Sequence, residues 1–438
     1  MTSKLLIKNG LLIDPSTQTE VKEDIRIESD QVVERGVGLK ERGDEDVIDA
    51  HGCWVSPGLV DMHTHLRDLA QKDKEDLHTG TRSAAAGGFT TVVAMANTEP
   101  VLDSGPNLSL YLQKISRNAV IEVLPVASVT RGLAGQELTN MVELSELGAV
   151  AFSDDGKPIQ NLVVLRRALE YVKLTGKVII SHAEDSDLAE GGCMHECSRS
   201  TSLGLQGITY ASETVAVARE LEMVRVTRSP YHFTHISCAP SVEKIRQAQA
   251  EGLPVTVDVT PHHLALNVEM MTEYDTSYKM NPPLRDNRDQ EALVQGIKDG
   301  TISAIATDHA PHTDLEKSLP FTSAPFGIIG LETAFPICYE SLVKAGHITF
   351  MKLIELFTTG PAKILDLELP SLSIGSRANI CIIDPDYKWN YNAKQGFSRS
   401  HNSPWNGRDL QSKVMCTIFK GKIVFQAAQL KERFSIRA

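Results

Sequence analysis

The chain has 438 residues, of which 42% are hydrophobic and 23% are charged, an ordinary composition for a globular protein with a sizeable core. Its formal net charge of 44 − 56 = −12 argues against a nucleic-acid or membrane-surface partner, which would require a basic face, but it allows a small anionic substrate. The sequence contains neither an apolar run of signal-peptide length near its start nor 18 consecutive apolar residues, so we expect no membrane span and a cytoplasmic protein.

The seven cysteines are scattered along the chain and include no CxxC pair. Cys193 and Cys197 are four residues apart, but no second pair completes a structural zinc site. We therefore expect reduced thiols, as in a cytosolic protein.

Both ends of the chain resemble short strands. An Asn9-Gly10 turn separates two apolar runs near the start, and residues 414–426 form a second hairpin pattern around Gly421. A lone hairpin is marginally stable in water. We therefore predict that residues 1–54 and 368–438 pair into one small β domain.

Residues 55–367 are predicted to form the second domain. Stretches with helical spacing, such as 162–176 and 241–252, separate eight apolar runs. This alternation predicts a (β/α)₈ TIM-type barrel. The eight predicted strands are 54–63, 89–97, 121–129, 149–155, 177–184, 231–237, 254–262 and 302–309.

The first predicted barrel strand ends in an HxH pair, His63 and His65. Side chains at i and i+2 of a strand point the same way, so both imidazoles can reach one point at the barrel mouth. The pair alone is a weak signal, because two surface or core histidines would look the same.

Other polar residues follow the ends of four more predicted strands, where barrels of this class carry their active sites. They are Asp155, His182, His235 and Asp308. Each histidine taken singly would be a core residue more often than a ligand. Together, four histidines and two aspartates suit two zinc ions that share a carboxylate and lie about 3.5–4 Å apart.

Several motifs resemble those of dihydroorotases, in the branch that bridges its metals with an aspartate rather than a carboxylated lysine. The resemblance covers almost the whole chain, from about residue 5 to 425. HxH is shared by the wider amidohydrolase superfamily, whereas ATDHAPH and NPPLR are rather specific for dihydroorotases. The motifs are DMHTHLR, AAAGGFTTV, SDDG, SHAED, FTHIS, NPPLR and ATDHAPH.

The resemblance implies a zinc-dependent, reversible interconversion of N-carbamoyl-L-aspartate and L-dihydroorotate in pyrimidine biosynthesis. One ion would be held by His63, His65 and Asp308, and the other by His182 and His235. Asp155 would bridge the ions, with Asp154 as the competing candidate. Asp308 would also act as the catalytic base and acid.

The resemblance also implies a set of substrate contacts. Arg67 would grip the substrate carboxylate, because a planar guanidinium suits bidentate binding. Asn97, Asn281 and His312 would add contacts, and the Phe326-Gly327 segment would contribute its backbone. Without the resemblance, Arg67 would be read as a surface arginine and the two asparagines as turn residues.

Two departures and two rival interpretations remain. The segment DLAQKDKED follows Arg67 where the family usually shows Glu-Pro-Gly, and residues 186–210 have no assignment. His262 and His263 could support the site or belong to a loop. The chain could instead be a hydantoinase or allantoinase, although these use a carbamylated lysine on the fourth strand and residues 149–155 contain none.

The other rival is a non-catalytic partner of aspartate transcarbamoylase, but such homologues usually lack several metal ligands. For an active enzyme we expect a homo-oligomer, such as a dimer, with an aspartate transcarbamoylase as a candidate partner.

Overall fold

The computed structural model describes residues 4–271, 273–428 and 434–435. Its centre is a parallel eight-stranded sheet in the order β17-β16-β15-β12-β11-β10-β9-β8. A parallel bridge between Thr64 and His309 joins the two outer strands, so the sheet closes into the predicted barrel. The strands are β8 (Leu59–Thr64), β9 (Phe89–Ala94), β10 (Glu122–Ala127), β11 (Ala151–Ser153), β12 (Val178–Ser181), β15 (Tyr231–Phe233), β16 (Val255–Val259) and β17 (Ala304–Ile305).

Helices cover the outside of the barrel. In α4, an apolar stripe of Val164, Leu165 and Ala168 is buried, and the side chain of Asn161 caps the first turn. The helices are α1 (Leu77–Ala86), α2 (Gly105–Asn118), α3 (Met141–Glu146), α4 (Leu162–Val172), α5 (Ser186–Ala189), α6 (Ser198–Leu203), α7 (Tyr210–Thr227), α8 (Ala239–Ala250), α9 (Pro261–Ala265), α10 (Asn287–Asp299), α11 (Asp314–Lys317), α12 (Ala334–Cys338), α13 (Phe350–Phe357) and α14 (Thr359–Ile364).

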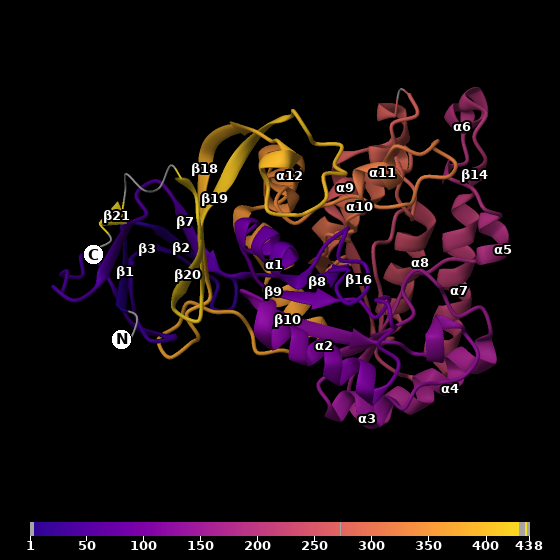
Figure 1. Cartoon of the computed structure of the whole chain (residues 1–438), viewed down its shortest axis with the longest axis horizontal. Helices are drawn as coiled ribbons and strands as arrows, with labels where there is room; N and C mark the ends of the chain where they lie inside the picture. The colour runs from indigo at the N-terminus through magenta and orange to yellow at the C-terminus, as the bar shows by residue number, and fades with distance from the viewer. Residues whose placement is uncertain (1–3, 272, 429–433, 436–438) are drawn as a thin grey trace.

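Two sheets from the chain ends lie beside the barrel, and Figure 1 shows the yellow C-terminal strands next to the indigo N-terminal ones. The six-stranded sheet has the order β20-β19-β18-β7-β2-β3, so β18 from the C-terminal part of the chain pairs with β7 from the N-terminal part. Its strands are β2 (Leu11–Asp14), β3 (Thr19–Lys22), β7 (Trp54–Pro57), β18 (Ile380–Asn390), β19 (Asp409–Phe419) and β20 (Lys422–Gln426). The five-stranded sheet contains β1 (Lys4–Lys8), β4 (Asp24–Glu28), β5 (Gln31–Gly36), β6 (Asp46–Asp49) and β21 (Phe434–Ser435).

The strand predicted over 54–63 is divided at Gly58. Residues before it join the terminal sheet as β7, and residues after it enter the barrel as β8. A Cβ at Gly58 would lie 2.2 Å from Thr90 Oγ1, so only glycine allows the chain to pass this close to β9. The unbroken apolar pattern hides this division because both halves are buried.

The segment that had no assignment contains α5, α6 and a small parallel pair, β13 (Met194–His195) and β14 (Gly207–Ile208). No helix within the described ranges has both the length and the apolarity needed to cross a membrane.

Candidate active site

The six predicted metal ligands converge at the carboxyl ends of the barrel strands. His63 lies in β8, and His65 directly follows it. Asp155, His182, His235 and Asp308 follow β11, β12, β15 and β17, and all six side chains are buried. Short strands that end at one rim of a closed sheet bring residues 245 positions apart to one place.

One group of ligands surrounds Asp308. Its Oδ1 lies 3.0 Å from His65 Nε2 and 3.5 Å from His63 Nε2. Ligand atoms of these three residues all lie within 4.8 Å of one another. A second such group consists of His63, Asp155 and His235.

Asp155 belongs to the second group and also faces the two histidines of the first. Its Oδ2 is 3.4 Å from His63 Nε2, and its Oδ1 is 3.6 Å from His235 Nε2. His235 Nε2 in turn faces His182 Nδ1 at 3.1 Å. The carboxylate therefore directs one oxygen to each half of the site, which is the arrangement a bridging ligand needs.

Asp154 faces away from this cluster. Its Oδ1 accepts hydrogen bonds from the backbone N–H groups of Val129 at 2.8 Å and Thr130 at 3.0 Å, and its Oδ2 accepts from the Thr130 hydroxyl. Asp154 thus holds the loop after β10, and the geometry favours Asp155 for the bridging position.

The cluster fits a cation. His63 Nε2 and Asp155 Oδ1 are buried and have no hydrogen-bond partner among the described residues. Burial opposes ionisation of Asp155, but the neighbouring imidazoles of His63 and His235 outweigh it and hold the pKa of this carboxyl well below its ordinary value. Burial likewise disfavours a charge on His63, yet Asp155 and Asp308 raise its pKa to about 9. The carboxylates of the cluster thus favour a positive charge beside them, which a bound cation would supply.

Two buried carboxylates support the ligands from inside the barrel. Asp61 Oδ1 accepts the backbone N–H groups of His63 and Thr307. Asp258 Oδ1 accepts the N–H of His235 at 2.6 Å, and its Oδ2 accepts the Thr234 hydroxyl, which lies 2.8 Å from His63 Nδ1. Sequence analysis missed both, although Asp61 continues the i, i+2 series of His63 and His65.

Arg67 adopts a left-handed backbone conformation with φ 54°, as do His235 at 41° and Asp308 at 49°. Non-glycine residues in this region are uncommon and cluster at functional sites. The Arg67 guanidinium is 3.3 Å from the Pro311 carbonyl and 3.4 Å from His312 Nε2. It forms no ion pair with a carboxylate among the described residues, so it is free to bind an anion.

The two asparagines predicted to bind substrate each contact predicted metal ligands. Asn97 Oδ1 lies 2.9 Å from His65 Nδ1, and its Nδ2 lies 3.4 Å from Asp155 Oδ2. Asn281 Nδ2 donates to Glu184 Oε2 at 2.9 Å and lies 3.4 Å from His182 Nε2.

The Phe326-Gly327 loop is held by its neighbours. Lys279 Nζ lies 4.6 Å above the Phe326 ring, and Lys317 Nζ donates to the Gly327 carbonyl at 3.0 Å. A Cβ at Gly327 would lie 3.6 Å from His312 Nε2, so this loop borders the predicted substrate residues.

His262 and His263 are both buried. His263 is held by Thr260 at 2.7 Å and by the Pro282 carbonyl at 3.0 Å, whereas His262 Nε2 has no partner among the described residues. The divergent loop after Arg67 is anchored by Glu75, a buried carboxylate that accepts from the Ser398 hydroxyl.

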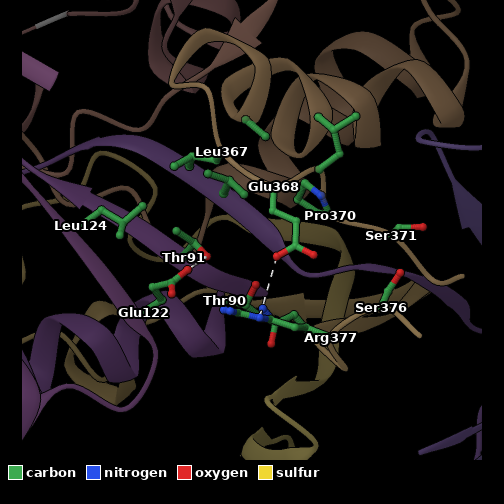
Figure 2. A pocket seen from close by; sticks show the side chains of 14 residues that line it. Thr90, Thr91, Glu122, Leu124, Leu367, Glu368, Pro370, Ser371, Ser376 and Arg377 are labelled. Carbon is green, nitrogen blue, oxygen red and sulfur yellow. Dashed lines mark hydrogen bonds and ion pairs between the residues drawn. The ribbon is translucent and has the colours of Figure 1, made fainter. Parts of the chain in front are cut away.

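A cavity of about 220 Å³ lies at the opposite end of the barrel. Figure 2 shows its lining, with Thr90, Thr91 and Glu122 at the starts of β9 and β10, and an ion pair between Glu368 and Arg377 at 3.8 Å. Because catalytic groups of such barrels lie at the other rim, this cavity is not the active-site candidate.

Comparison with known proteins decides the family. The family model described as "Dihydro-orotase-like" matches residues 52–241. A protein named dihydroorotase from Geobacter sp. (strain M21) is 45% identical over 423 residues, which cover 97% of this chain and 99% of that protein. A dihydroorotase from Pelotomaculum thermopropionicum is 44% identical over the same length.

The chain belongs to the dihydroorotase family.

Solved structures show the same fold at lower identity. An L-hydantoinase from Arthrobacter aurescens matches with a TM-score of 0.86 and 23% identity over 97% of this chain and 96% of its own. A dihydropyrimidinase from Brevibacillus agri matches with a TM-score of 0.85 and 22% identity over 97% of this chain and 95% of its own. These likenesses concern the architecture, and they confirm the predicted barrel.

Proposed function

We propose that this dihydroorotase-family chain interconverts N-carbamoyl-L-aspartate and L-dihydroorotate, the ring-closing step that its relatives' name describes. The observation that carries the proposal is the position of Arg67. Its guanidinium is half-buried, has no carboxylate partner among the described residues and lies at the rim that also carries the His–Asp cluster. A hydantoin ring offers no carboxylate to such a group, whereas dihydroorotate does.

We further propose that the cluster binds two zinc ions. His63, His65 and Asp308 would hold one, His182 and His235 would hold the other, and Asp155 would contact both. Nitrogen and oxygen donors of this kind suit zinc. Bound zinc lowers the pKa of water to about 7 and polarises a carbonyl oxygen.

Asp308 is the proposed proton carrier. Burial alone would keep it protonated, but the nearby His63 and His65 hold the pKa of its carboxyl well below the ordinary value, so it is ionised at neutral pH. Its Oδ1 contacts both imidazoles, while its Oδ2 makes no hydrogen bond to a described residue. In hydrolysis Oδ2 would accept a proton from the attacking water and deliver it to the departing ring nitrogen.

Arg67 and its neighbours would fix the remaining carboxylate of the substrate. His312 lies beside the guanidinium, and burial together with the charge on Arg67 lowers its pKa to about 3, so it is a neutral donor or acceptor at pH 7. Holding this carboxylate aligns the reacting amide with Asp308, and such positioning can lower a barrier by several kcal/mol.

The wider predictions stay part of the proposal. They are the division into a composite β domain (1–54 with 368–438) and a barrel (55–367), a homo-oligomer such as a dimer, an aspartate transcarbamoylase partner, and a cytoplasmic location. Free thiols support a reducing compartment, and they are found at Cys193, Cys197, Cys238, Cys338, Cys381 and Cys416. Light scattering of the purified chain, alone and with the transcarbamoylase, tests the two assembly predictions.

The proposed activity is tested by turnover of dihydroorotate and carbamoyl aspartate beside hydantoin and allantoin, with zinc quantified in the same preparation. We expect turnover of the first two compounds only. Turnover of hydantoin or allantoin instead would contradict the proposal. A zinc-loaded but inactive protein would favour the non-catalytic partner of aspartate transcarbamoylase.

A further inference from the structure

Glu184 lies two residues beyond His182, in the loop between β12 and α5. Its backbone carbonyl accepts hydrogen bonds from Gln160 Nε2 at 3.0 Å and Arg219 Nη2 at 3.4 Å. Its side chain is 16% exposed and accepts from Asn281 Nδ2 at 2.9 Å. These hydrogen bonds hold the backbone of Glu184 in place, and its largely buried carboxylate lies at the edge of the candidate site.

The two ring nitrogens of His182 face different neighbours. Nδ1 lies 3.1 Å from His235 Nε2, whereas Nε2 lies 3.4 Å from Asn281 Nδ2 and 3.9 Å from Glu184 Oε2. To share a cation with His235, Nδ1 must offer its lone pair, so the proton of the neutral ring resides on Nε2. Asn281 Nδ2 is itself a donor, so of these two neighbours only the Glu184 carboxylate can accept that proton and fix the ring's orientation. At 3.9 Å the pair is an ion-pair contact rather than a hydrogen bond, so the proposed bond requires the carboxylate to approach the ring.

The two ends of the Asn281 amide also have different surroundings. A carboxylate can only accept hydrogen bonds, so Glu184 selects the Nδ2 end. The Oδ1 end is buried and has no hydrogen-bond partner among the described residues. Leaving a buried acceptor unpaired is unfavourable, so this oxygen marks a place for a donor. The N–H groups of a ring amide or a ureido group are donors of that kind.

We propose that Glu184 is a positioning residue that orients His182 toward the cation and Asn281 toward the substrate's N–H group. One carboxylate thereby couples a metal ligand to substrate recognition. The second half rests on the proposed function, because it requires a substrate with an amide or ureido N–H. The first half does not, because the orientation of His182 affects metal binding whatever the substrate is.

Zinc affinity tests the first half without turnover. The chain is stripped with a chelator and titrated in zinc-buffered solution, as wild type, Glu184→Ala, Glu184→Gln and Asp187→Asn. The matched control, Asp187, is an exposed acidic residue three positions further on. We expect Glu184→Ala to weaken binding of one ion about 10- to 100-fold. Glu184→Gln keeps one acceptor oxygen and should lose less zinc affinity than Glu184→Ala. Asp187→Asn should bind zinc like wild type.

Steady-state kinetics test the second half. Glu184→Ala should raise KM for dihydroorotate about tenfold at saturating zinc, the effect of about one hydrogen bond. If Glu184 acts through Asn281, adding Glu184→Ala to Asn281→Ala should raise KM no further. Fully additive changes would overturn the coupling.

Wild-type zinc affinity and KM in Glu184→Ala would overturn the whole proposal. Thermal unfolding shows whether Glu184→Ala folds. If it does not, Glu184→Gln replaces it in the test, and a zinc affinity and KM equal to those of wild type in that variant would overturn the proposal. If wild type does not turn over dihydroorotate, the proposed function fails, and the zinc titration still decides the role of Glu184.

Discussion

The side-chain amide of Asn402 donates to the backbone carbonyl of Gly327 at 3.1 Å. The same amide nitrogen donates to the Ala310 carbonyl at 3.0 Å, and its oxygen accepts from the His312 N–H at 3.2 Å. Asn402 belongs to the segment that connects β18 and β19 of the terminal sheet. This segment therefore contacts Gly327 and His312, which are both predicted to bind substrate.

Substituting Asn402 should therefore affect substrate binding more than metal binding. Asn402→Ala removes three hydrogen bonds, one each to Ala310, His312 and Gly327, and we expect KM to rise about tenfold with zinc content unchanged. Asn392→Ala, at an exposed position of the same segment, is the matched control. Kinetics and zinc analysis of the three proteins check this, and loss of zinc in Asn402→Ala would argue against it.

The neighbouring aspartates should respond differently to amide substitution. Asp155→Asn removes the charge between the two halves of the cluster, so we expect loss of bound zinc and of measurable turnover. Asp154→Asn should retain zinc, because the hydrogen bonds of the Asp154 side chain to described residues all go to the loop after β10. Zinc analysis of the two purified variants distinguishes them. Retained zinc in Asp155→Asn together with lost zinc in Asp154→Asn would assign the bridging position to Asp154 instead.

Arg67→Met should leave the metal cluster intact and weaken substrate binding. Methionine fills similar space but cannot bind a carboxylate, and a charged hydrogen bond contributes about 1.5–3 kcal/mol, so we expect kcat/KM to fall at least about tenfold. Arg67→Lys keeps the charge but lacks the planar guanidinium, so its kcat/KM should lie between those of wild type and Arg67→Met. Unchanged kinetics in Arg67→Met would remove the carboxylate-binding role.

The pH dependence of stability should report on Glu220. This carboxylate is buried between Ser181 and Tyr231, and burial raises its pKa to about 7. Between pH 4.5 and 7 the folded chain then binds a proton that the unfolded chain releases, so the free energy of unfolding falls as pH rises through this window, by at most about 3 kcal/mol. Below this window the contribution is fully present, and above pH 7 it is lost.

Glu220→Gln cannot ionise and should lack this part of the pH dependence. Urea unfolding of both proteins at several pH values measures the difference. Parallel curves for wild type and variant between pH 4.5 and 8 would show that Glu220 keeps an ordinary pKa.

The barrel and the convergence of the six proposed ligands at its rim were predictable because each of these polar residues follows an apolar run. That pattern identifies the strand end, and the fold brings all strand ends to one rim. Asp258, Glu184 and Asn402 were not predictable in this way, because their partners lie on other segments. Asn402 is 90 residues from His312, and nothing in the local sequence connects them.

The division of the first strand at Gly58 escaped prediction for a related reason. Strands buried on both sides have no alternation that could mark a break. The turn chemistry of one glycine is visible in the sequence, but its close approach to Thr90 exists only in the folded chain.

The most direct test of the central claim is anomalous diffraction at the zinc absorption edge, from crystals grown with zinc and dihydroorotate. We expect two zinc peaks on either side of the Asp155 carboxylate, one beside His63, His65 and Asp308 and the other beside His182 and His235, with the ligand's carboxylate on Arg67. Peaks elsewhere, or a single peak that does not involve Asp155, would contradict the account.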